Sequence, residues 1–225
     1  MRKLTVTTFM SLDGVVQSPG GPEEDPSGGF GYGGWTVHFW DELMAEVMAR
    51  AFDEPHELLL GRRTYEIFAA HWRYITGDPI ADRLNQLRKY VASRTLSKVS
   101  WQGAELLRGD VAEAIRAIKA TPGPNLQVQG SSVLVQTLLE HDLVDEFTIW
   151  TFPVLLGRGK RLFGHGTPAG DLQLETSQTS TTGVLIATYA RAGDIPLGDV
   201  QPAEPSPAEL ARRLKLQAEG RSDVP

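Results

Sequence analysis

The stretch ELLLGRRTYEIFAA (57–70) decides how this chain folds. Its short apolar run, Leu58–Leu60, meets Gly61 and two arginines, and a helical pattern then starts at Thr64. A short apolar run bounded by a turn signal predicts a buried strand, and a strand that feeds a helix brings free backbone N–H groups to one point. Together with the positive charge of the arginines, these N–H groups favour a phosphate ligand.

The same pattern at a strand end occurs twice more. The two further strands are KYVASRTL (89–96), which ends in Ser93, Arg94 and Thr95, and NLQVQGSSVLVQTLL (125–139), which ends in Gly130, Ser131 and Ser132 before a helix. A single turn of this kind is more often a plain connection than a ligand site. Three of them, each with hydrogen-bond donors in the same place, predict a dinucleotide-binding site.

Strands and helices alternate along the chain as far as about residue 150. The expected strands cover 2–10, 57–60, 90–93, 99–107, 126–129 and 146–156, and the expected helices cover 39–52, 64–70, 80–88, 111–120 and 132–140. This order predicts an α/β fold with a mostly parallel sheet, helices on both faces and an antiparallel hairpin at 172–192. Ligands of such folds bind outside the carboxyl ends of the strands, where the three motifs lie.

Composition limits the classes of partner. The chain has 225 residues, of which 41% are hydrophobic, and a formal net charge of −6. We expect one globular domain over 1–193, followed by a Pro-rich and helical tail over 194–225. No basic stripe is present, so nucleic acid is not an expected partner. No apolar run is long enough for a membrane span or a signal segment, so we expect a cytoplasmic protein.

Cysteine and histidine usage argues against metal and thiol chemistry. The chain has no cysteine, which excludes disulfides, thiolate catalysis and zinc sites with cysteine ligands. Its five histidines show no metal-binding spacing. We therefore expect no metal site.

Several motifs together resemble the dihydrofolate reductase-like superfamily. They are SLDGVVQ (11–17), LLLGRRTYE (58–66), KYVASRTL (89–96), VQGSSVLVQTLL (128–139) and DEFTIWTFPVLLGRGKRLF (145–163). The branch they resemble most is the reductase domain of riboflavin biosynthesis, the C-terminal domain of bifunctional deaminase-reductases. The resemblance spans roughly residues 2–190 and implies a three-layer α/β/α fold and an NADPH-dependent reductase. Without cysteine for a zinc deaminase half, we expect no bifunctional enzyme.

The resemblance also implies a role for each strand-end residue. The residues expected to hold NADPH are Gly61, Arg62, Arg63 and Thr64 at its phosphates, Ser93, Arg94 and Thr95 at the adenosine end, and Gly130, Ser131 and Ser132 at the pyrophosphate. Arg63 and Arg94 could pair with the 2′-phosphate that distinguishes NADPH from NADH, the alternative being ordinary surface ion pairs. Many relatives have Gly-Gly where this chain has Gly130-Ser131, and whether that peptide is cis is left open.

Reduction of a C=N or C=O bond also needs a proton source. The candidate carboxylates are Asp13, in the SLDG motif, and Asp41, at the start of the first predicted helix. Asp13 could equally form a turn before glycine, and Asp41 could simply complement the helix dipole. Trp35, Phe39 and Trp40 could stack on a flat heterocycle or could be core aromatics. The glycine-rich loop before them could close as a lid.

The favoured function is that of an NADPH-dependent reductase of a small planar heterocycle resembling a pterin or a flavin precursor. The alternative is a non-catalytic NADPH-binding or sensor protein on the same fold, because fold does not fix function. A weaker alternative is a protein–protein module that acts through the tail over 202–220. Homodimers are common in the riboflavin-type branch, and the terminal hairpin is a candidate interface. The sequence does not name the substrate.

Overall fold

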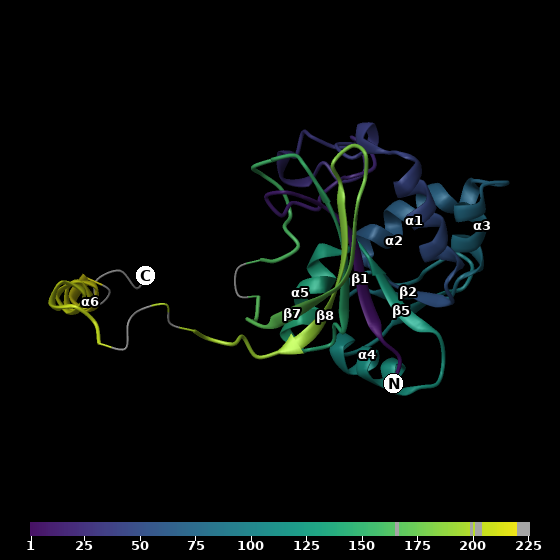
Figure 1. The fold of residues 1–225 in the computed structure, drawn as a ribbon. Coiled ribbons are helices and arrows are strands. Elements are labelled where there is room, and N and C mark those ends of the chain that lie inside the picture. The colour runs from purple at the N-terminus through teal and green to yellow at the C-terminus, as the bar shows by residue number, and fades with distance from the viewer. Residues whose placement is uncertain (165–166, 199, 201–203, 220–225) are drawn as a thin grey trace. The chain divides into compact units, whose positions relative to one another are not determined.

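In the residues described by the computed structural model, 1–164, 167–198, 200 and 204–219, eight strands form one sheet in the order β4-β3-β2-β5-β1-β6-β8-β7 (Figure 1). The strands are β1 (Leu4–Ser11), β2 (His56–Gly61), β3 (Lys89–Ala92), β4 (Ala104–Leu107), β5 (Asn125–Gln129), β6 (Glu146–Phe152), β7 (Asp171–Thr179) and β8 (Leu185–Gly193). Strands β1 to β6 pair in parallel, whereas β8 runs antiparallel to both β6 and β7. This arrangement confirms the predicted α/β fold with a terminal antiparallel hairpin.

Helices cover both faces of the sheet and complete three layers (Figure 1). They are α1 (Glu42–Asp53), α2 (Arg62–His71), α3 (Pro79–Gln86), α4 (Val111–Ala120) and α5 (Ser132–Glu140), with short 3-10 turns at Ser27–Gly29, Val37–Phe39 and Trp72–Tyr74. Successive side chains of a strand point to opposite faces. Leu59 accordingly packs in the cluster with α4 and α5, whereas Leu58 and Leu60 pack in the cluster with α1, α2 and α3.

The chain divides into two units, Met1–Asp194 and Ile195–Pro225. The first unit contains the whole sheet and helices α1 to α5. The second carries one helix, α6 (Pro207–Glu219), among its described residues. The sequence placed the end of the reductase-like domain at residue 193, one residue before this division.

Element boundaries differ from the sequence expectation where a cap or a breaker acts. The first helix begins at Glu42 rather than at residue 39, because the Asp41 carboxylate accepts the N–H of Met44 and caps it there. The strand expected over 146–156 stops at Phe152, immediately before Pro153, which has no N–H for the ladder. The helix after Gly61 begins at Arg62, two residues earlier than expected.

Candidate functional site

A cavity of about 1200 Å³ opens at the carboxyl ends of β1, β2, β3 and β5. All ten residues expected to hold the cofactor line it: Gly61, Arg62, Arg63, Thr64, Ser93, Arg94, Thr95, Gly130, Ser131 and Ser132. They come from three strand ends that are far apart in the sequence. A parallel sheet brings such ends to one edge, so the structure gathers the three motifs into one place.

Two helices start at this cavity without a side-chain cap. Neither α2, with Gly61 at its N-cap, nor α5, with Ser131 at its N-cap, has a side chain that accepts hydrogen bonds from its first turn. The first N–H groups of a helix have no partner within the helix. The residues of these two first turns, 62–64 and 132–134, all line the cavity. The cavity therefore receives two sets of free N–H groups and the positive ends of two helix dipoles.

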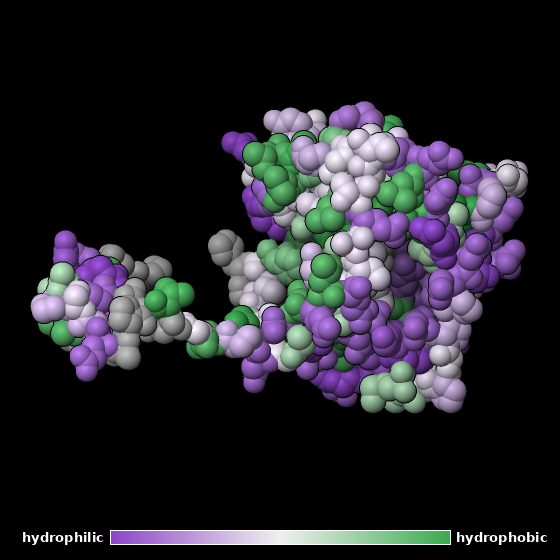
Figure 2. All heavy atoms as spheres, viewed as in Figure 1, coloured by the Kyte–Doolittle hydropathy of each residue, from purple (hydrophilic) through white to green (hydrophobic). Residues whose placement is uncertain are grey.

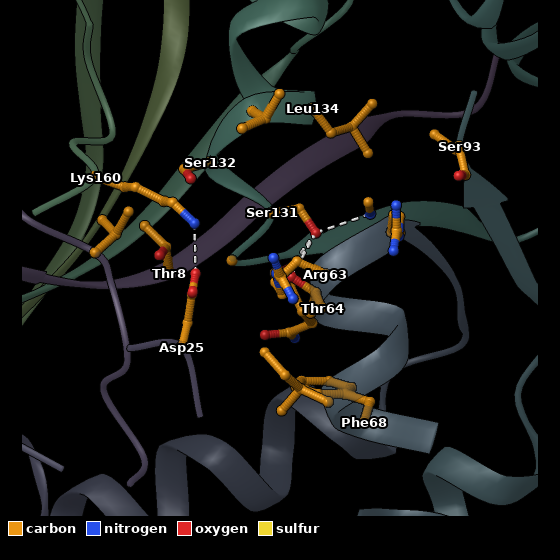
Figure 3. A pocket seen from close by; sticks show the side chains of 18 of the residues that line it. Thr8, Asp25, Arg63, Thr64, Phe68, Ser93, Ser131, Ser132, Leu134 and Lys160 are labelled. Atoms are coloured by element: carbon orange, nitrogen blue, oxygen red, sulfur yellow. Dashed lines mark hydrogen bonds and ion pairs between the residues drawn. The ribbon is translucent and has the colours of Figure 1, made fainter. Parts of the chain in front are cut away.

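The hydroxyl of Ser131 joins these two helix starts. Ser131 Oγ accepts the N–H of Gly61 at 3.0 Å and lies 3.0 Å from Thr64 Oγ1 and 2.9 Å from the carbonyl oxygen of Gln129. Figure 3 shows its side chain directed toward Thr64 across the gap between the turns. Ser131 has φ +55°, in the left-handed region, and Gly130 before it has φ +53°. The Gly130–Ser131 peptide is trans.

Three arginines line the cavity, and they differ in how far they are engaged. Arg62 donates to Glu66 Oε1 at 2.9 Å and to Thr95 Oγ1 at 2.6 Å, so its guanidinium ties α2 to the end of β3. Arg63 is 61% exposed and reaches Glu66 only at 4.0 Å. Arg94 is exposed and makes no hydrogen bond or ion pair with the described residues. Arg63 and Arg94 are therefore available to an anionic ligand.

The end of β3 is organised by its own hydroxyl groups. Ser93 Oγ accepts the N–H groups of Thr95 and Leu96, at 3.2 and 3.0 Å. This turn holds Arg94 at the edge of the cavity between Ser93 and Thr95, whose hydroxyl groups are both engaged in hydrogen bonds. In this group of three, the arginine is the one whose side chain has no partner within the described residues.

The two predicted proton donors lie away from the cavity wall. Asp13 accepts the N–H groups of Leu156 and Gly157, at 3.1 and 2.8 Å, and the hydroxyl of Ser11 at 2.6 Å. Burial opposes its ionisation, but these hydrogen bonds outweigh burial and lower the pKa of Asp13. The carboxylate thus links the turn that follows β1 to the turn at residues 156–157. Its catalytic role stays a prediction, one the geometry does not favour.

Asp41 has a similar structural use. Its Oδ1 accepts the N–H of Met44 at the start of α1, and its Oδ2 accepts both the N–H and the hydroxyl of Thr181, each at 2.7 Å. The N–H of Met44 and the hydroxyl of Thr181 lower the pKa of Asp41. A carboxylate held in its charged form is a poor proton donor, so this assignment too stays a prediction without geometric support.

The three predicted stacking aromatics pack beside the cavity without lining it. Trp35 is buried and donates its indole N–H to the carbonyl oxygen of Gln17 at 2.8 Å. Trp35 and Phe39 both pack edge-on against Phe152, with ring centroids 5.3 and 5.6 Å away. Trp40 is 42% exposed and meets Phe9, which does line the cavity. These residues form an aromatic core that supports the wall.

Sequence reasoning missed Glu24, Asp25 and Lys160, which all line the cavity. Glu24 and Asp25 belong to the loop that was interpreted only as a lid, and their acidic side chains among turn formers were the available signal. Lys160 lies in the GRGKRLF segment that carried the family resemblance but was given no role. Its ammonium lies 2.5 Å from Asp25 Oδ2, across 135 residues of sequence (Figure 3).

Two further structural features concern metal binding and the membrane. Within the described residues, no group of three or more His, Asp or Glu side chains is arranged to hold a metal ion. Among the helices that the structure describes, none is both long enough and apolar enough to cross a membrane.

The sheet order and the cavity at the carboxyl edge place this protein in the dihydrofolate reductase-like class of α/β folds. The model of the RibD C-terminal domain family matches residues 2–186, so the chain belongs to that family. This membership supports a reductase role of the riboflavin-biosynthesis type.

Comparison with individual proteins agrees with the fold. The uncharacterized proteins YyaP and YwjB of Bacillus subtilis (strain 168) are each 25% identical to this chain over 195 residues. The alignment with YyaP covers 84% of this chain and 94% of YyaP. The alignment with YwjB covers 85% of this chain and 99% of YwjB. A crystal structure of a candidate riboflavin biosynthesis protein from Shewanella sp. PV-4 matches with a TM-score of 0.64 and 24% identity over 85% of this chain and 99% of that chain. A pyrimidine reductase-like protein from Corynebacterium diphtheriae matches with a TM-score of 0.58 and 12% identity, covering 86% and 93% of the two chains.

Proposed function

We propose that this protein is an NADPH-dependent reductase of a small planar heterocycle. One observation carries the proposal: two open helix N-termini converge on a single cavity with Arg63 and Arg94, two arginines whose guanidinium groups make no hydrogen bond with the described residues. Backbone N–H groups at a helix start bind phosphate oxygens, and an unpaired guanidinium binds a phosphate through two parallel hydrogen bonds. A dinucleotide with a 2′-phosphate presents anionic groups for both kinds of donor.

The residues present fit NADPH. The first turns of α2 and α5 would hold the pyrophosphate, and Arg63 and Arg94 would hold the 2′-phosphate. Glycine at position 61 leaves room for a phosphate between the first turns of α2 and α5. A Cβ there would lie 3.4 Å from the Cβ of Ser131 and would narrow the gap between the two turns. When bound, NADPH supplies the hydride, and the protein supplies position and electrostatics.

A reduction also needs a proton, and the cavity wall offers a better group than Asp13 or Asp41. Three carboxyl groups line the cavity: Glu24, Asp25 and Asp110. Burial raises the pKa of Glu24, whereas the pKa values of the other two are lowered. Glu24 therefore keeps its proton to a higher pH than Asp25 and Asp110, and because it also lines the cavity we propose it, beside Asp13 and Asp41, as a candidate for the proton-handling role.

The test is calorimetric titration of the purified protein with NADPH and with NADH at one salt concentration. We expect tight NADPH binding and much weaker NADH binding. NADPH oxidation is then followed with a pterin, a flavin precursor and a quinone. Tight binding without oxidation by any of them would support the alternative, a non-catalytic NADPH-binding or sensor protein. Binding of neither nucleotide would contradict both.

Two features outside the cavity bear on partners. The edge strand β7 carries exposed Leu172 and Leu174, and Figure 2 shows apolar residues among polar ones on the face that includes β7 and β8. An exposed edge strand is a template for pairing with another chain, so we propose a homodimer through this hairpin, testable by light scattering.

The tail hypothesis concerns residues 202–220, of which 204–219 are described. Helix α6 exposes Leu210 and Leu214, which lie one turn apart. Deletion of the tail tests this module: unchanged assembly and unchanged NADPH binding would remove it.

A further inference from the structure

The loop over residues 17–36 lies between β1 and α1 and has the composition of a lid. It contains seven glycines, and its residues 17–21, Glu24 and Asp25 line the cavity. Long loops beside a binding cavity often close over the bound ligand. A segment that opens and closes has low local stability, with few buried apolar contacts and few protected backbone hydrogen bonds. The contacts of this loop are of the opposite kind.

The side chain of Gln17 joins three separate pieces of backbone. Its amide nitrogen donates to the carbonyl oxygens of Asp25 and Ser27, at 2.8 and 2.9 Å, and its Oε1 accepts the N–H of Lys160 at 3.0 Å. The carbonyl oxygen of Gln17 accepts the indole N–H of Trp35 at 2.8 Å. Gln17 is only 5% exposed. Movement of the loop would leave these buried polar groups without partners, which is unfavourable.

Two hydroxyl groups join the ends of the loop to its other parts. Ser18 Oγ accepts the N–H of Asp25 at 2.7 Å and donates to the carbonyl oxygen of Asp25 at 2.9 Å. The carbonyl oxygen of Ser18 accepts the N–H of Gly34 at 2.9 Å. Thr36 donates its hydroxyl to the carbonyl oxygen of Pro19 at 2.7 Å. The backbone at Asp25 is therefore held at both its N–H and its carbonyl group.

The loop also packs into the core. Phe30 and Trp35 are buried in the same cluster as Phe152. Gly33 lies so close to Gly21 that a Cβ at position 33 would be 2.5 Å from the carbonyl oxygen of Gly21. Glycine at position 33 thus lets two parts of the loop pack tightly together. Opening the loop would expose two buried aromatic side chains to water.

Lys160 holds the loop from outside. Its backbone N–H donates to Gln17, its carbonyl oxygen accepts the N–H of Val16 at 2.8 Å, and its ammonium lies 2.5 Å from Asp25 Oδ2 (Figure 3). The side chain of Asp25 is 9% exposed, and breaking a buried ion pair leaves an uncompensated charge. The segment around Lys160 and the loop therefore stay together.

We propose that residues 17–36 form a fixed wall of the cavity rather than a lid, and that Gln17 is the positioning residue that fixes this wall. The cavity then keeps its shape in the ligand-free protein, and binding of a ligand requires no loop closure. The inference goes beyond the proposed function, because it concerns the ligand-free protein and holds for any ligand.

Amide hydrogen exchange of the ligand-free protein tests the wall. The N–H groups of Asp25 and Gly34 are both bonded within the loop, so they should exchange at least about a hundredfold more slowly than in an unfolded peptide. Saturation with NADPH should protect them no more than it protects the amides of β6, which report stabilisation of the whole fold. Exchange as fast as in an unfolded peptide, or a larger gain with NADPH, would overturn the inference.

The Gln17→Ala variant tests the positioning residue. It should accelerate exchange at Asp25 and Gly34 at least about tenfold. Gln136→Ala is the matched control, because Gln136 also bridges backbone groups, the carbonyl of Leu162 and the N–H of Gly164, but lies outside the loop. It should leave both amides unchanged. If Gln17→Ala does not fold, Trp35→Phe removes one bond to Gln17 and should accelerate the same amides by a smaller factor. No acceleration in the variant that folds would overturn the role of Gln17.

Binding kinetics provide a readout that a purely structural role of Gln17 would not change. Without a closure step, the observed rate of NADPH binding in stopped flow should rise linearly with NADPH concentration in a single phase. Gln17→Ala should add a second, slower phase, because its loop must first become ordered. A saturating rate in the wild type, or a single linear phase in Gln17→Ala, would overturn the inference. If NADPH does not bind at all, the proposed cofactor is wrong, and exchange in the ligand-free protein still decides between wall and lid.

Discussion

Five helices of the first unit begin in two different ways. In α1, α3 and α4, an aspartate at the N-cap accepts an N–H of the first turn: Asp41, Asp78 and Asp110. In α2 and α5, the N-cap positions hold Gly61 and Ser131, and no side chain caps the first turn. The two uncapped starts both line the cavity.

Helix α4 also starts at the cavity, but its N-terminus is capped. Asp110 lines the wall, yet its carboxylate closes its own helix by accepting the N–H of Glu113 at 2.9 Å. A helix that starts at the carboxyl edge of the sheet is therefore not necessarily uncapped. The difference lies in the N-cap residue, and it leaves two of three neighbouring helix starts able to bind an anion.

The largest effect is expected from closing α2. Gly61 has φ −71°, which any residue adopts, so Gly61→Asp places a capping carboxylate at the N-terminus without backbone strain. We expect NADPH binding to weaken about a hundredfold, because the carboxylate takes the N–H groups and repels phosphate. Calorimetry measures the change. Gly61→Ala, which adds the Cβ without the charge, should cost far less, and equal losses in both variants would contradict the account.

The next effect concerns Arg63 and Arg94, whose guanidinium groups make no hydrogen bond with the described residues. Arg63→Gln and Arg94→Gln should each weaken NADPH binding about tenfold, since a hydrogen bond to a charged group contributes roughly 1.5–3 kcal/mol. NADH binding should stay nearly unchanged, because NADH has no 2′-phosphate. Arg88, which pairs with Glu105 away from the cavity, provides the control Arg88→Gln. An equal loss of NADH affinity would remove the role assigned to both arginines.

A smaller effect is expected at Ser131, whose hydroxyl connects the starts of α2 and α5. Ser131→Ala removes the hydroxyl that accepts the N–H of Gly61 and should lower the free energy of unfolding by about 1 kcal/mol. Denaturant unfolding measures this loss. Ser131→Gly removes the same hydroxyl but relieves the left-handed φ, so it should be more stable than the alanine variant by about 1 kcal/mol. If the two variants are equally stable, the backbone at 131 is not strained.

The smallest effect on binding is expected at the capped start of α4. Asp110→Ala should lower the melting temperature by about 2–4 °C through loss of the cap and should leave NADPH binding intact or slightly improved. The N–H of Glu113 lowers the pKa of Asp110 below its ordinary 3.8. The stability difference should therefore be full above about pH 4 and fade as the pH falls through the depressed pKa. A tenfold loss of NADPH affinity would show that α4 belongs to the anion site.

Local sequence patterns predicted the sheet and the open helix starts well. A strand that ends in glycine and feeds a helix is a short-range signal, and Gly61 and Gly130 identified both open starts. The sequence also placed the three motifs at one edge, because parallel strands leave no other arrangement. The family resemblance suggested which ligand would bind at these helix starts. It did not predict whether the other helices of the domain are capped.

The ion pair between Asp25 and Lys160 in the cavity wall could not be predicted from local patterns. Asp25 and Lys160 are 135 residues apart in the sequence, and neither the loop around Asp25 nor the GRGKRLF segment contains a pattern that predicts their contact. For Asp13 and Asp41, local patterns left two uses open, and the catalytic one stays a prediction. Both were candidates for proton transfer, but their carboxylates accept backbone N–H groups, a turn-forming and capping use that was the simpler alternative for each.

The most direct measurement is an NMR titration of the ¹⁵N-labelled protein with NADPH. We predict that the largest amide shifts fall in the first turns of α2 and α5, residues 62–64 and 132–134. The first turns of α1 and α3 should be unchanged, and that of α4 should shift less than the two open starts. Equal shifts at capped and uncapped helix starts, or no shifts at 62–64 and 132–134, would contradict the claim that the open helix ends form the cofactor site.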